Sequence, residues 1–297
     1  GFNFKRVKID EAIEFADHFE RTYTGIPKNE KISGVFAENH FDWNSSNIKL
    51  ITGFRADNHN QYGLLITNRG LLKCNFSKNT IARFSIGSGW RTINLFSEQP
   101  HLIATNKNII IADNLKPEKA VNYGFNILNA IYMDNLEIQI ILDFYKTNFT
   151  NQIHPDYYSN PLEIYVNNFE GRSTSNSMQA ELGIEIFEAL GLKIAYNYLD
   201  VFHIHNGEKH TLPFNSKHHI LNTISYRPIE KNWYLDINSH WSGKKKLTNT
   251  STYPIEYQRP NISDDYWIIN GQFTIEIISL DLEIYLGCEN IFNCSIN

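Results

Sequence analysis

The chain has 297 residues and a formal net charge of −5, and this mild charge gives no electrostatic argument for a nucleic-acid partner. No apolar run approaches the roughly 18 residues that a membrane-spanning helix needs. Membrane-spanning β-strands are not excluded, because their alternating apolar and polar residues give no high average hydropathy. The three cysteines, Cys74, Cys288 and Cys294, lack metal-ligand spacing and cannot all pair with one another, so we expect small, half-buried thiols.

In chain order, the first pattern is residues 9–20, IDEAIEFADHFE, which predicts a short helical segment in an early loop. The rest of the chain is dominated by alternating apolar and polar residues, which indicate β-strands because successive side chains point to opposite faces. About thirteen such segments occur, and many reach the roughly 9–11 residues of a membrane-crossing strand. The clearest are residues 121–133, 136–144, 178–186, 233–241, 267–277 and 282–288.

Residues 136–144, LEIQIILDF, illustrate the alternation. Every second residue from Leu136 is apolar, while Glu137, Gln139 and Asp143 lie on the opposite face. A soluble sandwich strand has this pattern with its apolar face inward, and an outer-membrane barrel strand has it with the apolar face toward lipid. One strand leaves both interpretations open.

The connections between the predicted strands alternate in length, and this favours the barrel. The short links are residues 44–47, 78–79, 134–135, 190–192, 230–232 and 279–281. The long connections are residues 92–119, 147–175, 206–217 and 247–265. Outer-membrane barrels have short periplasmic turns and long extracellular loops, whereas a soluble sheet has no reason to segregate loop length by side. The sequence therefore predicts an all-β, antiparallel transmembrane β-barrel with its long connections outside the cell.

Several stretches resemble motifs of TonB-dependent outer-membrane receptors. They are LITGFRADNHNQYG (50–63), IARFSIGSGWR (81–91), DNLKPEKAVNYG (113–124), SNSMQAELGIEIFEALGLKIAYNYLD (175–200) and YLGCENIFN (285–293). In order and spacing, these stretches resemble the family over nearly the whole chain. One departure is Asn68, which stands where the family usually has a proline before arginine.

The resemblance implies that residues 1–297 form one barrel domain, the C-terminal part of a barrel of about 22 strands with a plugged lumen. A plug domain, a TonB box and the final strand are not recognisable, so we expect a fragment of a longer polypeptide. An odd number of about thirteen antiparallel strands cannot close. We therefore expect an open, curved half-barrel whose first and last strands are not paired with each other.

The resemblance also implies a function, which is active import of a scarce ligand across the outer membrane. Such ligands include ferric siderophores, haem, cobalamin and glycans. The implied partners are the TonB complex, acting through a plug outside this chain, outer-membrane lipid, and a small-molecule or metal-chelate ligand. No catalytic triad, phosphate loop or pair of catalytic carboxylates is visible, so we expect neither enzyme activity nor a cofactor. Three alternatives stay open: a passive porin-like channel, a binding or adhesion barrel, and a soluble antiparallel β-protein.

Four candidate ligand-binding residues lie near predicted strand ends. Trp90 and Arg91 open the first long connection, where an indole stacks on flat ligands and a guanidinium pairs anions; the competing interpretation is an aromatic girdle residue and a lumen charge partner. Arg55 and Asp57 share a face that projects into the lumen. We favour a role for this pair in holding the wall to the plug.

Histidines form the second group of candidates. His203 and His205 share the polar face of one strand, and His219 and His240 lie on the polar faces of the next two. A hairpin between the first two strands predicts that His205 and His219 are cross-strand neighbours. Imidazoles suit haem iron or a transition metal, but polar residues fill barrel lumens generally, and we assign no metal site.

Overall fold

The fold is known from a computed structural model. It describes residues 1–9, 12–14, 22–24, 28–43, 46–102, 104–105, 107–156, 160, 162–205, 207–247, 250–251 and 254–292. These residues are almost entirely β-strand, as the alternation predicts. No helix in this described part of the chain is long and apolar enough to cross a membrane.

Fourteen strands form one antiparallel sheet. Thirteen of them make a continuous wall, and the short strand β15 (Glu208–Thr211) pairs with β14 beside it. The wall strands, in order, are β1 (Phe2–Ile9), β4 (Lys28–Trp43), β5 (Ile48–His59), β6 (Gly63–Asn75), β7 (Thr80–Arg91), β9 (Glu118–Met133), β10 (Leu136–Thr150), β13 (Arg172–Ile186), β14 (Leu190–His205), β16 (His218–Tyr226), β17 (Trp233–Ser242), β18 (Tyr266–Ile277) and β19 (Leu282–Cys288).

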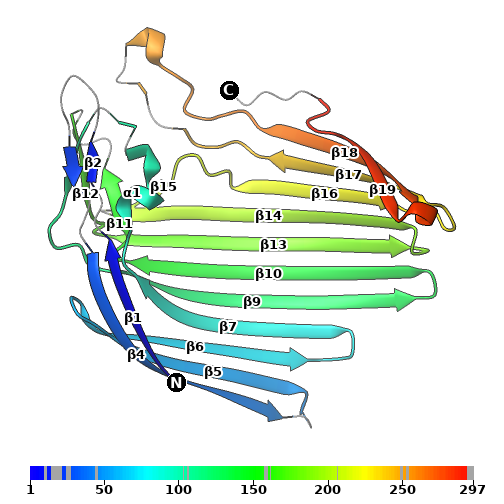
Figure 1. The fold of residues 1–297 in the computed structure, drawn as a ribbon, viewed down its shortest axis with the longest axis horizontal. Coiled ribbons are helices and arrows are strands. Elements are labelled where there is room, and N and C mark those ends of the chain that lie inside the picture. The colour runs from blue at the N-terminus through cyan, green and yellow to red at the C-terminus, as the bar shows by residue number, and fades with distance from the viewer. Residues whose placement is uncertain are drawn as a thin grey trace.

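The wall is an open, curved sheet rather than a closed cylinder (Figure 1). Within the described residues, β1 pairs only with β4 and β19 only with β18, so the first and last wall strands are not paired with each other. The prediction of an antiparallel half-barrel of about thirteen strands is confirmed.

Short turns join the wall strands at one end of the sheet, here called the turn end, and long connections gather at the other, the loop end (Figure 1). The turns are residues 44–47, 76–79, 134–135, 187–189, 227–232 and 278–281, the last including η4 (Ile278–Leu280). One connection at the loop end, residues 60–62, is also short. The predicted segregation of loop length by side is therefore confirmed with this one exception.

The predicted turn at residues 190–192 is wrong. Leu190 already begins β14, and the chain reverses at 187–189, where Phe187 and Glu188 take positive φ values of 53° and 54°. Two successive residues in this conformation match the twist of the flanking strands. The sequence signal was misleading because neither residue is a glycine or an asparagine.

The loop end carries its own regular structure. A three-stranded sheet joins β8 (Asn108–Ile111), β12 (Glu163–Asn168) and β11 (Ile153–Asp156), with β8 and β12 parallel. The remaining elements are α1 (Leu95–Glu98), η2 (Pro100–Leu102), η3 (Ile255–Tyr257), β2 (Ala12–Glu14) and β3 (Thr22–Thr24). Because β2 pairs with β3, the predicted helix is wrong at these residues, and the rest of that segment lies outside the described residues or in β1.

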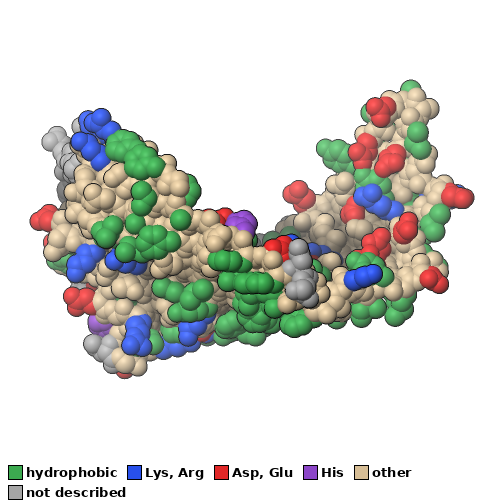
Figure 2. Space-filling view, turned by 90° about the horizontal axis from the view of Figure 1, so that it is seen from below, with side chains coloured by type: hydrophobic (Ala, Val, Ile, Leu, Met, Phe, Trp, Pro, Cys, Tyr) green, Lys and Arg blue, Asp and Glu red, His purple; other side chains and the backbone are tan. Residues whose placement is uncertain are grey.

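The strand register keeps the two faces of the wall in line. Leu142 of β10, 45% exposed, lies opposite Ile127 of β9 and Ala180 of β13. Figure 2 shows hydrophobic side chains along the convex underside of the trough. Exposed aliphatic residues in such a band are expected where lipid, not water, covers them.

The apolar band ends sharply toward the loop end. Two residues beyond Phe144, the same face carries Lys146, which lies opposite Asn176 of β13, and Asn176 in turn lies opposite Asp200 of β14. Asp200 pairs with two lysines, Lys209 and Lys217. This polar row marks the boundary between the apolar band and the loop end.

The opposite face of the wall is polar and internally hydrogen-bonded. Nη1 of Arg83 donates to Oδ1 of Asn126 at 2.7 Å, and Nδ2 of Asn126 donates to Oδ1 of Asp143 at 2.9 Å. Lys193 pairs with Glu181 at 2.6 Å on the next strands. These contacts explain why a strand with one apolar face carries acids and amides on the other.

The main buried apolar cluster among the described residues lies in the loops, not in the wall. Its members are Ile93, Leu95, Phe96, Leu102, Leu115, Ile153, Ile164 and Val166. They come from two connections, residues 92–117 and 151–171, which we call the loop cap. The cap is thus folded around its own core, and it positions the site described below.

The assignment of faces predicts unequal effects for two neighbouring substitutions. Ile140→Arg places a charge on the apolar face near the middle of the band and should cost about 2–4 kcal/mol in a complete barrel. Gln139→Arg places the same charge on the polar face and should cost much less. The folded fraction in lipid vesicles, read from heat-modifiable gel mobility, measures both. Equal losses for the two variants would contradict the assignment.

Candidate ligand-binding site

A cavity of about 460 Å³ opens on the polar face near the loop end of β1 and β4–β7. Four residues singled out in the sequence line it: Arg55, Asp57, Trp90 and Arg91. The structure therefore brings two separate parts of the chain, the ends of β5 and β7, to one hollow. Their role in ligand binding stays a prediction, and their contacts define what each side chain offers.

Arg55 and Asp57 form a two-pronged ion pair. Nε and Nη2 of Arg55 donate to the two carboxylate oxygens of Asp57 at 2.7 Å each, and Nη2 also donates to Oδ1 of Asn3 at 3.0 Å. Asp57 is 2% exposed. Gly34 lies opposite it, and a Cβ there would lie 2.2 Å from Oδ1 of Asp57. Glycine is therefore needed at this position, and the pair braces the wall.

Trp90 is held by a buried histidine. Its ring meets that of His59 edge-on, with 5.8 Å between centroids, and His59 is 1% exposed. Nδ1 of His59 accepts hydrogen bonds from the backbone N–H groups of Gln61 (3.1 Å) and Tyr62 (3.3 Å), which leaves the proton of a neutral ring on Nε2. Trp90 thus packs against a buried ring where it lines the cavity.

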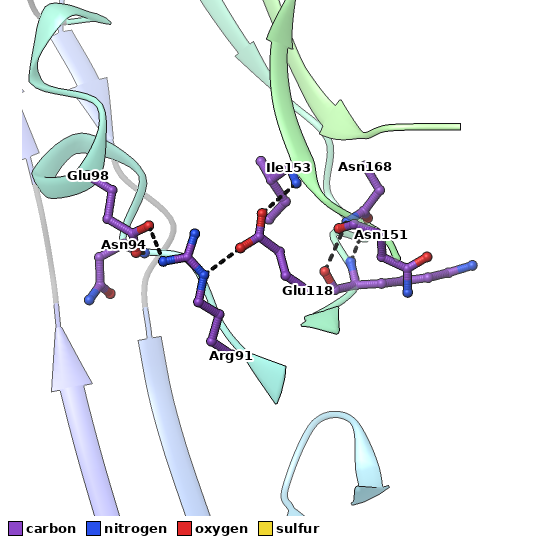
Figure 3. A network of polar contacts seen from close by, with 8 residues as sticks. Arg91, Asn94, Glu98, Glu118, Asn151, Ile153 and Asn168 are labelled. Carbon is purple, nitrogen blue, oxygen red and sulfur yellow. Dashed lines mark hydrogen bonds and ion pairs between the residues drawn. The ribbon is translucent and has the colours of Figure 1, made fainter. Parts of the chain in front are cut away.

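Arg91 connects the wall to the loop cap (Figure 3). Its Nη1 lies 2.8 Å from Oε2 of Glu98, and its Nε lies 2.5 Å from Oε2 of Glu118. Oε1 of Glu118 accepts a hydrogen bond from the backbone N–H of Ile153 at 2.7 Å. Glu118 is 7% exposed, so one buried carboxylate joins β7, β9 and the start of β11. Two carboxylates already pair with Arg91, which leaves little positive charge for an anionic ligand.

Asn168 makes a second connection within the cap (Figure 3). Its Oδ1 accepts from the backbone N–H of Lys116 at 2.7 Å, and its Nδ2 donates to the carbonyl oxygens of Asn151 (2.7 Å) and Lys116 (3.0 Å). The amide therefore joins the two connections that share the buried apolar core.

A cluster of imidazole rings lies at the loop end of β14. The ring of His203 lies 5.4 Å from that of His210 on β15 and 5.6 Å from that of His154 on β11, measured between centroids. Phe169 packs against His203 at 4.8 Å and His205 at 6.0 Å. His203 lies opposite Ser173, beyond the polar row at Asp200, so the cluster is outside the apolar band.

Burial lowers the pKa of two of these rings, His203 and His154. Burial, together with His154, His210, His205 and Lys246 nearby, lowers the pKa of His203 to about 4. Burial also lowers the pKa of His154, although Asp156 opposes the shift. Because both pKa values lie below the ordinary value of about 6.5, both rings stay uncharged at neutral pH with a nitrogen lone pair available.

The other two predicted histidines form a separate pair. The rings of His219 and His240 stack at 5.6 Å with an interplanar angle of 3°. The predicted contact between His205 and His219 is wrong, because β16 meets β14 with His219 opposite Asn197, while His205 lies opposite Glu208 of β15. The intervening hairpin takes up residues that the prediction had left in a plain loop.

Sequence reasoning missed Glu118, His154 and His210. An Asn-Gly dipeptide at 206–207 is a strong hairpin signal that places His203 opposite His210, and Gly207 has the positive φ of 85° that such a turn needs. No comparable local signal exists for Glu118 and His154, because their partners are brought near only when the cap folds. Of the three cysteines, Cys74 is half-buried and Cys288 exposed, and Cys294 lies outside the described residues.

Glu118→Ala should loosen the cap. The substitution leaves the buried N–H of Ile153 without its acceptor, and a hydrogen bond to a charged group contributes about 1.5–3 kcal/mol. Limited proteolysis should then cut residues 151–171 faster, with cleavage sites mapped by mass spectrometry. Glu98→Ala is the matched control, because it removes the other carboxylate on Arg91 but spares Ile153. Equal cleavage rates for the wild type and Glu118→Ala would contradict this role.

Comparison with known sequences identifies one family. A family model described as "TonB dependent receptor-like, beta-barrel" matches residues 1–291. No curated protein sequence matches the chain.

Solved structures share the fold. One is the ferric enterobactin receptor PfeA from Pseudomonas aeruginosa, in its complex with BCV-L6. Its sequence is 16% identical to this chain and its TM-score is 0.68. The match covers 90% of this chain and 40% of the receptor. The copper transporter OprC is 11% identical with a TM-score of 0.69, over 93% and 44%. The FrpB iron transporter from Neisseria meningitidis is 14% identical with a TM-score of 0.66, over 92% and 42%. This chain spans less than half the length of each.

Proposed function

Because this chain belongs to the TonB-dependent receptor β-barrel family, we propose that it is the wall and extracellular loop region of an outer-membrane receptor that imports a small metal chelate. The observation that carries the proposal is the division of the wall. One face is an apolar band, the other is a hydrogen-bonded polar surface, and the folded loops gather at one end. That division suits a barrel with lipid outside, a polar lumen within and a ligand-binding end.

The outer membrane is the proposed location, and residues 1–297 are proposed to be one barrel domain of a longer protein. In hydrocarbon, each unsatisfied backbone group costs several kcal/mol, so open sheet edges are not tolerated there. The edges of β1 and β19 are unpaired within the described residues. We therefore propose that the plug, the TonB contact and the closing strands belong to other parts of the longer protein. The energy for import would come from the TonB complex.

A metal chelate is the proposed ligand class. Structures with the same fold carry the names of a ferric enterobactin receptor, an iron transporter and a copper transporter. In this chain, the cavity at Arg55 and Trp90 offers a guanidinium edge and an indole to such a ligand. The side chains that line the cavity suit binding, and the family is one of receptors, so the proposed activity is transport and not catalysis.

Uptake measurements test the function. The complete gene product that contains these residues would be expressed in a Gram-negative host that lacks its own iron receptors. Radiolabelled ferric enterobactin and a copper(II) salt are the probes, each with and without TonB. We expect uptake of at least one probe and its loss without TonB. Uptake that survives the loss of TonB would indicate a passive channel, and binding without uptake would indicate an adhesion barrel; either result would overturn the proposal.

The orientation is tested by labelling. In a background where Cys74, Cys288 and Cys294 are replaced by serine, Ile255→Cys should react with a membrane-impermeant thiol reagent in intact cells, because Ile255 lies at the loop end and is 88% exposed. Asn135→Cys, in a turn at the opposite end, should react only after the cells are opened. The reverse pattern would place the loop cap inside the cell.

A further inference from the structure

Three histidines from three different elements converge at the loop end, away from the cavity at Arg55 and Trp90. His154 comes from β11 in the loop cap, His203 from the wall strand β14, and His210 from the hairpin strand β15. The ring of His203 is central, at 5.4 Å from His210 and 5.6 Å from His154. These ring contacts are separate from the backbone pairing that forms the wall. We therefore consider what chemistry the three rings offer together.

The register places two of the rings side by side. His203 and His210 are directly opposite in the antiparallel pairing of β14 with β15, where side chains start about 4.5–5.5 Å apart. Their rings are nearly parallel, at 22°. Two imidazoles bound to one zinc ion come to a similar separation, since each nitrogen then lies about 2.0–2.1 Å from the metal.

We propose that His203, His210 and His154 bind a divalent transition-metal ion of the Zn²⁺ or Cu²⁺ type, which joins the loop cap to the β14–β15 hairpin. Imidazole nitrogen is a preferred ligand for these ions. The ion is a resident crosslink between loops, and the inference does not depend on the import function proposed above. It assigns a site where the sequence assigned none.

Binding requires the rings to turn. As placed, no three His, Cys, Asp or Glu side chains in the described part of the chain are arranged to hold a metal ion. The His210 side chain is 44% exposed and has room to rotate about its own side-chain bonds. Glu208, 81% exposed, has a carboxylate oxygen 3.9 Å from Nε2 of His210 and offers an oxygen ligand.

Burial first, and then the charges around the ring, favour the neutral form of His203. Lys246 and the neighbouring histidines disfavour a proton on His203, while Asp156 faces His154 with a compensating negative charge. Metal binding requires unprotonated imidazole, and the lowered pKa values of His203 and His154 keep these two rings unprotonated at neutral pH. The positive charge of Lys246 also repels a metal cation. Binding of the ion therefore depends on its bonds to the imidazole nitrogens and not on attraction by nearby charges.

A bound ion would have a structural consequence. His154 follows Ile153, whose backbone N–H is held by Glu118, and His203 belongs to the wall. A metal bridge between them therefore adds a second attachment of residues 151–171 to the sheet. The cap would be held by the Glu118 carboxylate on one side and by the metal on the other.

The test uses the complete gene product that contains these residues, purified in detergent and stripped of metal by a chelator. Copper(II) alone is the probe, and electron paramagnetic resonance should show hyperfine splitting from at least two imidazole nitrogens. His203→Gln should weaken copper binding by about tenfold or more and remove part of that splitting. His40→Gln is the matched control, because His40 lies on β4, away from the cluster, and contacts Glu38; it should leave copper binding unchanged.

A second variant guards against misfolding. His210→Gln alters an exposed side chain on β15 outside the wall, and heat-modifiable gel mobility confirms that the barrel is intact. It should weaken copper binding as His203→Gln does, and bound metal should slow proteolysis within 151–171 in the wild type alone. Unchanged copper binding in both variants, or an equal loss in His40→Gln, would overturn the proposal. Neither readout involves TonB or uptake, so failure here leaves the import proposal separately testable.

Discussion

The pairing of backbone N–H and C=O groups across the wall is the constraint on which the rest of this structure depends. An apolar band faces outward over many strands, and no backbone group within it can find water as a partner. The strands between β1 and β19 pair with a neighbour on each side, and this pairing fixes the register and therefore the face of each residue. The strand pairing therefore places the apolar residues of β10 on one face. It places the hydrogen-bonded side chains of Arg83, Asn126 and Asp143 on the other.

A wall built in this way has no interior of its own, and this explains where the buried core lies. Side chains on one face meet lipid and those on the other meet a polar lumen. Among the described residues, the main buried apolar cluster lies in the loop cap around Leu102, Ile164 and Val166. Buried apolar residues of the wall, such as Ile32 and Leu65, are not part of that cluster. The cap behaves as a small folded unit attached to the ends of β7, β9 and β10, and the buried carboxylate of Glu118 ties it to the wall.

The candidate binding groups follow the same division. Arg55, Asp57, Trp90 and Arg91 meet at one cavity, yet most of their charge is already paired within the protein. The imidazoles at the loop end differ, because His203 and His154 are neutral and lie between the wall and the cap. Chemistry directed at a metal is therefore better supported at the histidines, and recognition of a larger ligand is better supported at the cavity.

The sequence by itself determined the wall. Period-two alternation and the lengths of the connections are local properties of the sequence. They were enough to predict an antiparallel half-barrel and to assign Ile140 to the apolar face and Gln139 to the polar face. Tertiary structure alone decided the turn at 187–189, the pairing of β2 with β3, the neighbour of His219 and the partners of Glu118. These depend on contacts between segments far apart in the chain, such as Glu118 with Ile153 and His154 with His203. Loop conformation is set by such long-range contacts and by the entropy of closing each loop, and neither leaves a periodic mark in the sequence.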